Sequence, residues 1–261
     1  MKKIILLILC LPFYLNAEQI KRQSFDSEQY TFVLKSESSG EYELVNEERS
    51  EQPMTPWSTF KIANSLIALD LGVVKDLEQS LTFDLTKYPI QSWWLKRWYE
   101  KPLCLSEAFK YSAVPIYQEI ASEISNQKMQ KYLDKFNYGN RNISSGIDAF
   151  WLNGSLKISA KEQVSFLQKF NEKQLPVSRR ASALLKEIML VEETESYKLY
   201  AKTGGGHLQK GQVLGWYVGF VENKEGVHYF ALNIEGTQFR DIMRKRKSLV
   251  KEHLSKAGVL N

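Results

Sequence analysis

The chain has 261 residues, of which 43% are hydrophobic and 12% aromatic, which is enough for a substantial core in one large domain or two small ones. The formal charge of +5 is mild, and it argues against nucleic acid as a partner. The densest basic run, residues 244–247, fits a solvated helix face. The three histidines, His207, His228 and His253, lack metal-ligand spacing, which argues against a metalloenzyme and against a triad with histidine as base.

The first 17 residues have the pattern of a secretory signal. Two lysines precede an apolar run over residues 4–11, and Ala17 closes the segment before the polar Glu18. The apolar run is too short to span a bilayer as a helix. We therefore expect export and removal of residues 1–17, which takes away two lysines and no acid and leaves a formal charge of +3.

The two cysteines favour neither a disulfide framework nor a metal site. Cys10 lies in the predicted signal, and lipidation there is the weaker alternative because bulky Leu9 precedes it. Cys104 would remain alone between two leucines, which predicts a buried, inert thiol. We expect a periplasmic protein if the source is a diderm bacterium, and otherwise a secreted or cell-surface one, with no integral membrane segment after signal removal.

The N-terminal half begins with strands and continues with a helix. Residues 30–34 and 41–45 alternate in polarity around a Ser- and Gly-containing turn, which predicts a hairpin. Residues 58–71 are apolar nearly all round and stop at Gly72, which predicts a helix buried in the middle of the molecule. Residues 81–105 break into prolines, charges and tryptophans, which indicates irregular structure.

The middle of the chain is predicted to be helical and its end to return to strands. Helical periodicity covers 115–125, 127–136, a stretch after the capping box at Ser159, and 178–191. Strand patterns cover 197–202, 212–221 and 227–235, separated by Gly-rich or charged turns, and a last helix covers 241–256.

This order of elements predicts an α+β fold for residues 18–261. One central antiparallel sheet of about five to seven strands would be assembled from both ends of the chain and flanked by helices, with an all-helical lobe inserted between. No repeat or long linker marks a boundary. We predict a single two-lobed catalytic domain that behaves as one cooperative unit.

Two short stretches suggest nucleophilic catalysis. Ser58 and Lys61 would share one face at the positive end of the predicted buried helix, so a nucleophile and a base would lie side by side. A predicted strand ends in Lys202-Thr203-Gly204, which can present a cation and a hydroxyl to a carboxylate. Ser-x-x-Lys together with Lys-Thr-Gly is a signature of serine β-lactamases and penicillin-binding proteins.

Further motifs narrow this signature. Ser112-Ala113-Val114 precedes a predicted helix, Tyr138-Gly139-Asn140 follows another, and Trp151 lies in an aromatic stretch. With the two stretches above, in this order and spacing, the mature chain resembles the class D β-lactamases, the oxacillinase family of serine hydrolases. Val114 stands where penicillin-binding transpeptidases and class A enzymes have Asn. The resemblance implies the β-lactamase and transpeptidase fold and hydrolysis of penicillin-type β-lactams.

The resemblance also implies roles for individual residues. Ser58 would be acylated, and Lys61, N-carboxylated by CO2 or bicarbonate, would be the general base. Ser112 would relay a proton, and Lys202 would assist electrostatically. The carbamate needs an apolar wall and a donor, which Val114 and the Trp151 indole would supply. No cofactor or metal is implied beyond CO2.

Substrate binding is assigned by the same resemblance. Backbone N–H groups of Ser58 and Gly205 would form the oxyanion hole. Thr203, Gly204 and Lys202 would receive the substrate carboxylate. An arginine of the last helix would assist them, and Arg246 fits that position better than Arg244. The residue after Gly204 is frequently bulkier in this family, whereas here Gly205 and Gly206 follow, so the shape of the pocket rim and the substrate spectrum stay open.

Three other functions are less consistent with the sequence. A β-lactam sensor domain that acylates without turnover shares these motifs but normally follows spanning helices. A penicillin-binding transpeptidase is disfavoured by Val114. A non-enzymatic binding protein has no reason to hold all four motifs in order. Small β-lactams are the expected partners of a monomer or homodimer.

Overall fold

The computed structural model describes residues 29–261, so the predicted signal over residues 1–17 lies outside the described residues. One antiparallel sheet has the strand order β2-β1-β6-β5-β4-β3. This confirms the predicted antiparallel sheet of five to seven strands. The strands are β1 (Tyr30–Ser36), β2 (Tyr42–Val45), β3 (Leu190–Glu193), β4 (Tyr197–His207), β5 (Val213–Asn223) and β6 (Gly226–Gly236).

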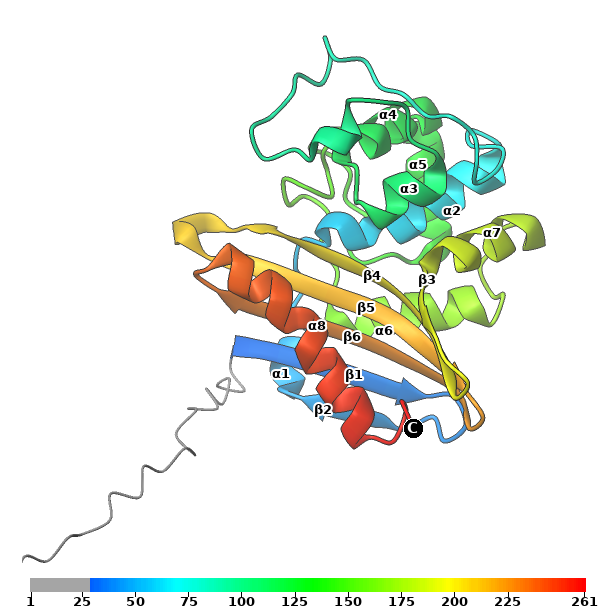
Figure 1. Ribbon diagram of the computed structural model, residues 1–261, viewed down its shortest axis with the longest axis vertical. Coiled ribbons are helices and arrows are strands. Elements are labelled where there is room, and N and C mark those ends of the chain that lie inside the picture. The colour runs from blue at the N-terminus through cyan, green and yellow to red at the C-terminus, as the bar shows by residue number, and fades with distance from the viewer. Residues whose placement is uncertain (1–28) are drawn as a thin grey trace, which may run out of the picture.

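Both ends of the chain contribute to this sheet, as Figure 1 shows. The first strand, β1, lies between its hairpin partner β2 and the last strand, β6. In the register of β1 and β6, Phe32 lies opposite Leu232. The middle of the chain forms the helical lobe, drawn in cyan and green beside the sheet (Figure 1).

Helices cover both faces of the sheet. Helix α8 (Phe239–Lys256) packs on β4, β5 and β6 over one apolar cluster that contains Ile242, Val250 and Leu254. Helix α6 (Ala160–Asn171) packs on the other face, over β1, β5 and β6. The larger core lies on that second face and continues into the helical lobe. In residues 29–261 no helix is both long and apolar enough to cross a membrane.

Helix α2 (Lys61–Leu71) runs through the centre of the larger core, as predicted, and every residue from Lys61 to Leu69 is buried. Its C-cap is Gly72 at φ 71°, a left-handed conformation that glycine adopts without strain. The start of the helix differs from the prediction. The helix was predicted to begin at residue 58, but Ser58 lies in a 3-10 turn, η2 (Trp57–Phe60), that leads into the helix at Lys61.

The helical lobe contains the predicted helices with shifted ends. They are α4 (Val114–Ile124), α5 (Asn126–Phe136) and α7 (Arg179–Met189). In residues 29–261 two helices were not predicted, α3 (Leu105–Lys110) and a short α1 (Glu47–Ser50) that follows β2. The capping box at Ser159 is present, with Ser159 and Glu162 bonding each other's backbone N–H groups. The helix predicted over 178–191 ends at Met189, since Leu190 begins the edge strand β3.

The stretch over residues 81–105 is irregular, as predicted, except for the 3-10 turn η3 (Lys96–Trp98) and the start of α3. Trp94 and Trp98 are buried, whereas Trp93 is 61% exposed. Cys104 is only half-buried, contrary to the buried thiol that was predicted, because it caps α3 together with Glu107.

Candidate active site

Ser58 and Lys61 are brought together by one helical turn. The 3-10 turn η2 carries Ser58, and Lys61 is the first residue of α2. The Lys61 Nζ lies 3.0 Å from the Ser58 Oγ and donates a hydrogen bond to it. Because α2 is buried on all sides, the Lys61 side chain is fully buried. The two side chains are therefore in hydrogen-bond contact, as their spacing in the sequence predicts.

Burial changes the acid–base behaviour of Lys61. Desolvation lowers the pKa of its amine from 10.5 to about 7, since the charged form is costly away from water. The centroid of the Tyr117 ring lies 4.9 Å from the Lys61 Nζ, and no sequence pattern singles out Tyr117 for this position. At neutral pH a large fraction of Lys61 is therefore neutral.

An apolar wall and one free donor lie beside this turn. Trp151 is fully buried, stacks on Phe60 at a ring separation of 5.4 Å, and accepts the Trp57 backbone N–H at 3.1 Å. Among residues 29–261 its indole N–H, although buried, has no hydrogen-bond acceptor. Val114 is 9% exposed and begins α4. A buried donor without an acceptor is costly, so this site favours an anionic group that supplies one.

Ser112 and Lys202 form a second polar pair. Ser112 lies between α3 and α4 at φ 55°, a conformation that is uncommon for a serine. The Lys202 Nζ donates to the Ser112 Oγ at 2.5 Å and to the Thr203 carbonyl at 3.1 Å. Burial first, and then the charges of Lys61 and Arg246, hold the pKa of Lys202 well below its usual range. Three basic side chains, those of Lys61, Lys202 and Arg246, thus surround one small region.

Glycines let the turn that carries Ser58 approach the sheet. A Cβ added to Gly204 would lie 2.8 Å from the Pro56 carbonyl oxygen and 3.0 Å from the Thr59 nitrogen, so η2 rests directly on β4. The Trp216 indole donates to the Thr55 carbonyl at 2.9 Å and ties the same segment to β5. The glycines 204–206, expected to leave the strand for a turn, are instead part of β4, which runs to His207.

Arg246 of α8 reaches the same strand. Its guanidinium donates to the Gly204 carbonyl and to the Met243 sulfur. Burial lowers the pKa of Arg246 to about 10, so it remains charged at neutral pH. Arg244 points into solvent and pairs with Asp241 at 2.6 Å. The structure therefore places Arg246, and not Arg244, beside Lys202 and Thr203.

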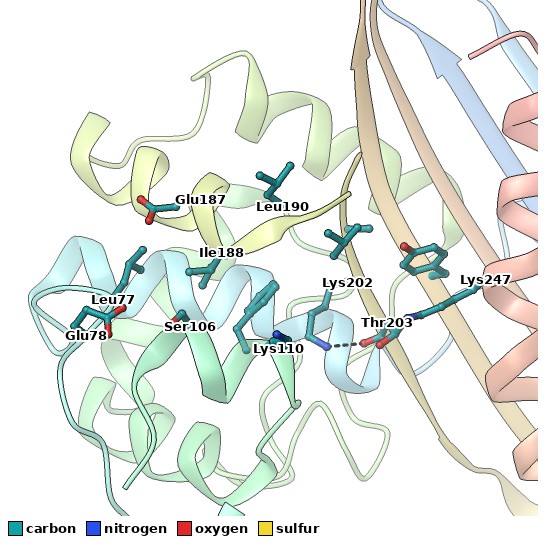
Figure 2. Close-up of a pocket in the computed structure, with 14 residues that line it drawn as sticks. Leu77, Glu78, Ser106, Lys110, Glu187, Ile188, Leu190, Lys202, Thr203 and Lys247 are labelled. Carbon is teal, nitrogen blue, oxygen red and sulfur yellow. Dashed lines mark hydrogen bonds between the residues drawn. The ribbon is translucent and has the colours of Figure 1, made fainter. Parts of the chain in front are cut away.

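A cavity of about 570 Å³ adjoins this region (Figure 2). It extends from Lys202 and Thr203 along α3 and α7 towards Glu78, and Lys247 of α8 lies at its sheet end. Neither Ser58 nor Lys61 is among its lining residues. Lys247 is exposed, as its predicted place on a solvated face requires, and it also lines this cavity, with its Nζ 5.9 Å from the centroid of the Tyr217 ring.

The Tyr138-Gly139-Asn140 motif supports the site from behind. Tyr138 is buried and makes an edge contact with Phe60 at a ring separation of 5.6 Å. The Asn140 side chain accepts the Lys157 backbone N–H at 3.0 Å and holds the loop closed. The Tyr138 ring thus helps to orient Phe60, which lies two residues after Ser58.

Known proteins resemble this chain over most of its length. Residues 19–256 match the family model of the penicillin-binding protein transpeptidase domain. The β-lactamase OXA-48 of Klebsiella pneumoniae is 40% identical over 228 residues, which are 87% of this chain and 83% of that protein. The probable β-lactamase YbxI of Bacillus subtilis is 35% identical over 230 residues, which are 88% of this chain and 81% of that protein.

Solved structures agree with these relatives. The class D β-lactamase FUS-1 (OXA-85) of Fusobacterium nucleatum superposes with a TM-score of 0.82 at 33% identity, over 89% of this chain and 94% of that one. The class D β-lactamase of Sebaldella termitidis superposes with a TM-score of 0.83 at 34% identity, over 90% of this chain and 94% of that one. With Ser58, Lys61, Ser112 and Lys202 gathered in one place, the chain belongs to the class D β-lactamases, within the penicillin-binding transpeptidase fold.

Proposed function

We propose that this β-lactamase is exported and hydrolyses the amide bond of penicillin-type β-lactams through an acyl-enzyme on Ser58. The observation that carries the proposal is the 3.0 Å contact between Lys61 Nζ and Ser58 Oγ at a fully buried lysine. Export rests on the signal pattern of residues 1–17 alone.

We propose further that Lys61 is N-carboxylated. The neutral amine would bond to the carbon of CO2 and release one proton, giving an anionic carbamate. A lysine whose pKa is about 7 is partly neutral at physiological pH and can react in this way. The Trp151 indole N–H, buried without an acceptor in residues 29–261, fits a carbamate oxygen. When present, the carbamate supplies a general base next to Ser58.

The side chains around Ser58 then have separate tasks. The Ser58 oxygen attacks the lactam carbonyl, and the bond from that carbon to the ring nitrogen breaks. Ser112, held by Lys202 at 2.5 Å, passes a proton to the departing nitrogen. The N–H groups of Ser58 and Gly205 stabilise the oxyanion, at about 3 kcal/mol per donor. Water then hydrolyses the ester and restores Ser58.

The substrate carboxylate would bind at the part of β4 that lies nearest Arg246 of α8. Thr203 supplies a hydroxyl, and Lys202 and Arg246 supply basic groups. Within residues 29–261 these two side chains donate hydrogen bonds to a hydroxyl, to backbone carbonyls and to a sulfur, and to no carboxylate. Arg246 already donates to the Gly204 carbonyl, so its guanidinium is held in place before the substrate arrives.

Turnover of a chromogenic cephalosporin tests the mechanism. Wild type should lose activity after mild acid treatment and regain it with bicarbonate, because a carbamate decomposes when protonated. Lys61→Ala should lose at least about 100-fold in kcat at any bicarbonate concentration. Lys128→Ala, which removes an exposed lysine of α5, is the matched control and should behave as wild type.

Three results would contradict the proposal in different ways. Unchanged turnover in Lys61→Ala would exclude Lys61 as the base. Wild-type activity indifferent to acid and bicarbonate would exclude the carbamate. A stoichiometric burst without turnover would identify a sensor-type protein that acylates and stops.

A further inference from the structure

Trp57 has an unusual position directly before the nucleophile. Its φ is 51°, in the left-handed region where a bulky side chain is a rare outlier. Its backbone N–H donates a hydrogen bond to the Trp151 carbonyl oxygen at 3.1 Å. Such a conformation persists only where the surroundings hold it, and it frequently occurs at functional sites. The backbone just before Ser58 is therefore held in a conformation that fixes the orientation of the Trp57 indole.

The indole packs against the surface of β4 at Gly206. A Cβ added to Gly206 would lie 2.5 Å from three atoms of the Trp57 ring, a distance at which one of the two must move. The indole N–H is buried and has no acceptor within residues 29–261, so packing holds the ring and no hydrogen bond does. The indole occupies the space that a side chain at position 206 would fill.

The chemistry of a β-lactam shows what else needs this space, if the proposed function holds. The carbonyl carbon attacked by Ser58 has two neighbours in its ring, the nitrogen and the carbon that carries the acylamino side chain. Ser112 and Thr203 take the nitrogen side and the carboxylate. The acylamino side chain must therefore lie on the opposite side, along β4 beyond Gly205. At about 3.3 Å per residue, Gly206 is about 10 Å from Thr203, which is the reach of that side chain.

We propose that Trp57 and Gly206 form a reciprocal pair that determines which acyl side chains the enzyme accepts. The Trp57 indole lies over Gly206, a strand position with no side chain. Together the two residues limit the space that the substrate's acyl side chain can occupy. This inference rests on the proposed function and assigns a specificity role to Trp57, a residue outside the proton-transfer and carboxylate-binding groups.

A double-mutant cycle with two substrates tests the pair. 6-Aminopenicillanic acid has no acyl side chain, and oxacillin has a bulky one. Trp57→Ala should raise the ratio of kcat/KM for oxacillin to kcat/KM for 6-aminopenicillanic acid by about 10-fold or more, the size of effect that pocket contacts give. Trp57→Phe keeps a smaller ring and should give an intermediate ratio, which keeps the test informative if Trp57→Ala unfolds.

The coupling between the two positions is the sharper readout. In the wild-type background Gly206→Ala should lower kcat/KM by about 10-fold, because the added methyl displaces the indole. In the Trp57→Ala background the same substitution should cost less than about 2-fold, since the space is then empty. Circular dichroism and the Tm establish that each variant is folded.

Two matched substitutions serve as controls. Tyr42→Ala removes an exposed aromatic side chain of β2, at the edge of the sheet opposite β3. Gly236→Ala adds a methyl in the same sheet, 2.6 Å from the end of the Ile242 side chain. Both should leave the substrate ratio within about 2-fold of wild type, because neither touches the acyl side of the site.

The outcomes separate this inference from the proposed function. Equal costs of Gly206→Ala in both backgrounds, or a ratio unchanged by Trp57→Ala and Trp57→Phe, in an enzyme that turns over penicillins, would overturn the pair alone. Absence of any β-lactam turnover in the wild type would overturn the proposed function and the pair with it.

Discussion

Lys61, Lys202 and Arg246 bring three basic groups together in a largely buried place. Burial lowers the pKa of each of these side chains, and the charges of Lys61 and Arg246 lower the pKa of Lys202 further. A core without these charges would be more stable. These buried basic groups therefore cost stability. In return, they favour the binding of an anionic group, whether a carbamate or a substrate carboxylate.

The pKa of Lys61 gives a pH-dependent prediction. Its value is about 7 in the folded protein against 10.5 when exposed, so the unfolded state binds more protons between these values. The penalty for burying Lys61 is complete below pH 7 and disappears as the pH rises towards 10.5. In CO2-free buffer, Lys61→Met should therefore be more stable than wild type at pH 7, by on the order of 4 kcal/mol at most.

Urea unfolding at several pH values measures this difference. The advantage of Lys61→Met should shrink as the pH rises from 7 to 10, while Lys128→Met should show no such trend. An advantage that stays constant over this range would mean that the amine of Lys61 does not titrate as described.

At the same scale, the sequence predicted the reactive pairs better than their surroundings. Ser58 and Lys61 are three residues apart, so one helical turn fixes their distance whatever the rest of the fold does. Ser112 and Lys202 needed the resemblance to a family, because 90 residues separate them. Trp57 could not be selected, since its role depends on the empty side of Gly206, which only the fold brings near.

Strand β4 shows why element boundaries resisted prediction. Three consecutive glycines are rare inside strands, because glycine has no side chain to pack and loses much freedom, so a turn was expected. The packing of η2 on Gly204 and Gly206 overrides that preference. Similarly, α7 passes into β3 without a break in apolar pattern, and only pairing with β4 reveals the change at Leu190.

The capping box of α6 was predictable, and it gives a prediction at this scale. The Ser159 hydroxyl accepts the Glu162 N–H at 3.2 Å, and Ser159 is only 2% exposed. Ser159→Ala should lower the free energy of unfolding by about 1 kcal/mol, measured by urea denaturation. Ser196→Ala, an exposed serine in a turn, is the control and should stay within about 0.5 kcal/mol. An equal effect of both substitutions would show that the box adds nothing.

In residues 29–261 one apolar cluster continues from the sheet into the helical lobe. The larger apolar cluster joins α2 and the helical lobe to residues of β1, β4, β5 and β6. The active site lies where these parts meet, with Ser58 from the segment before α2, Ser112 from the helical lobe and Lys202 from the sheet. Separation of the lobes would therefore dismantle the site.

This continuity predicts cooperative unfolding of residues 18–261. Calorimetry should give a single transition whose calorimetric and van't Hoff enthalpies agree. Leu66→Ala, at a fully buried position of α2, should cost about 2–5 kcal/mol and lower the Tm without splitting the transition. Leu85→Ala, at a position that is 49% exposed, is the matched control. Two separate transitions would contradict the single-unit interpretation.

The position of β1 between β2 and β6 also sets an order for folding. Phe32 pairs with a strand around Leu232, so the sheet cannot be completed until nearly the whole chain is available. The same holds for the active site, because the turn that carries Ser58 rests on β4, and Arg246 of the last helix bonds the Gly204 carbonyl of that strand. Ser58 and Lys61 are made early in synthesis, but the rest of the site is complete only when the last fifth of the chain has been delivered, and the nascent protein stays inactive until then.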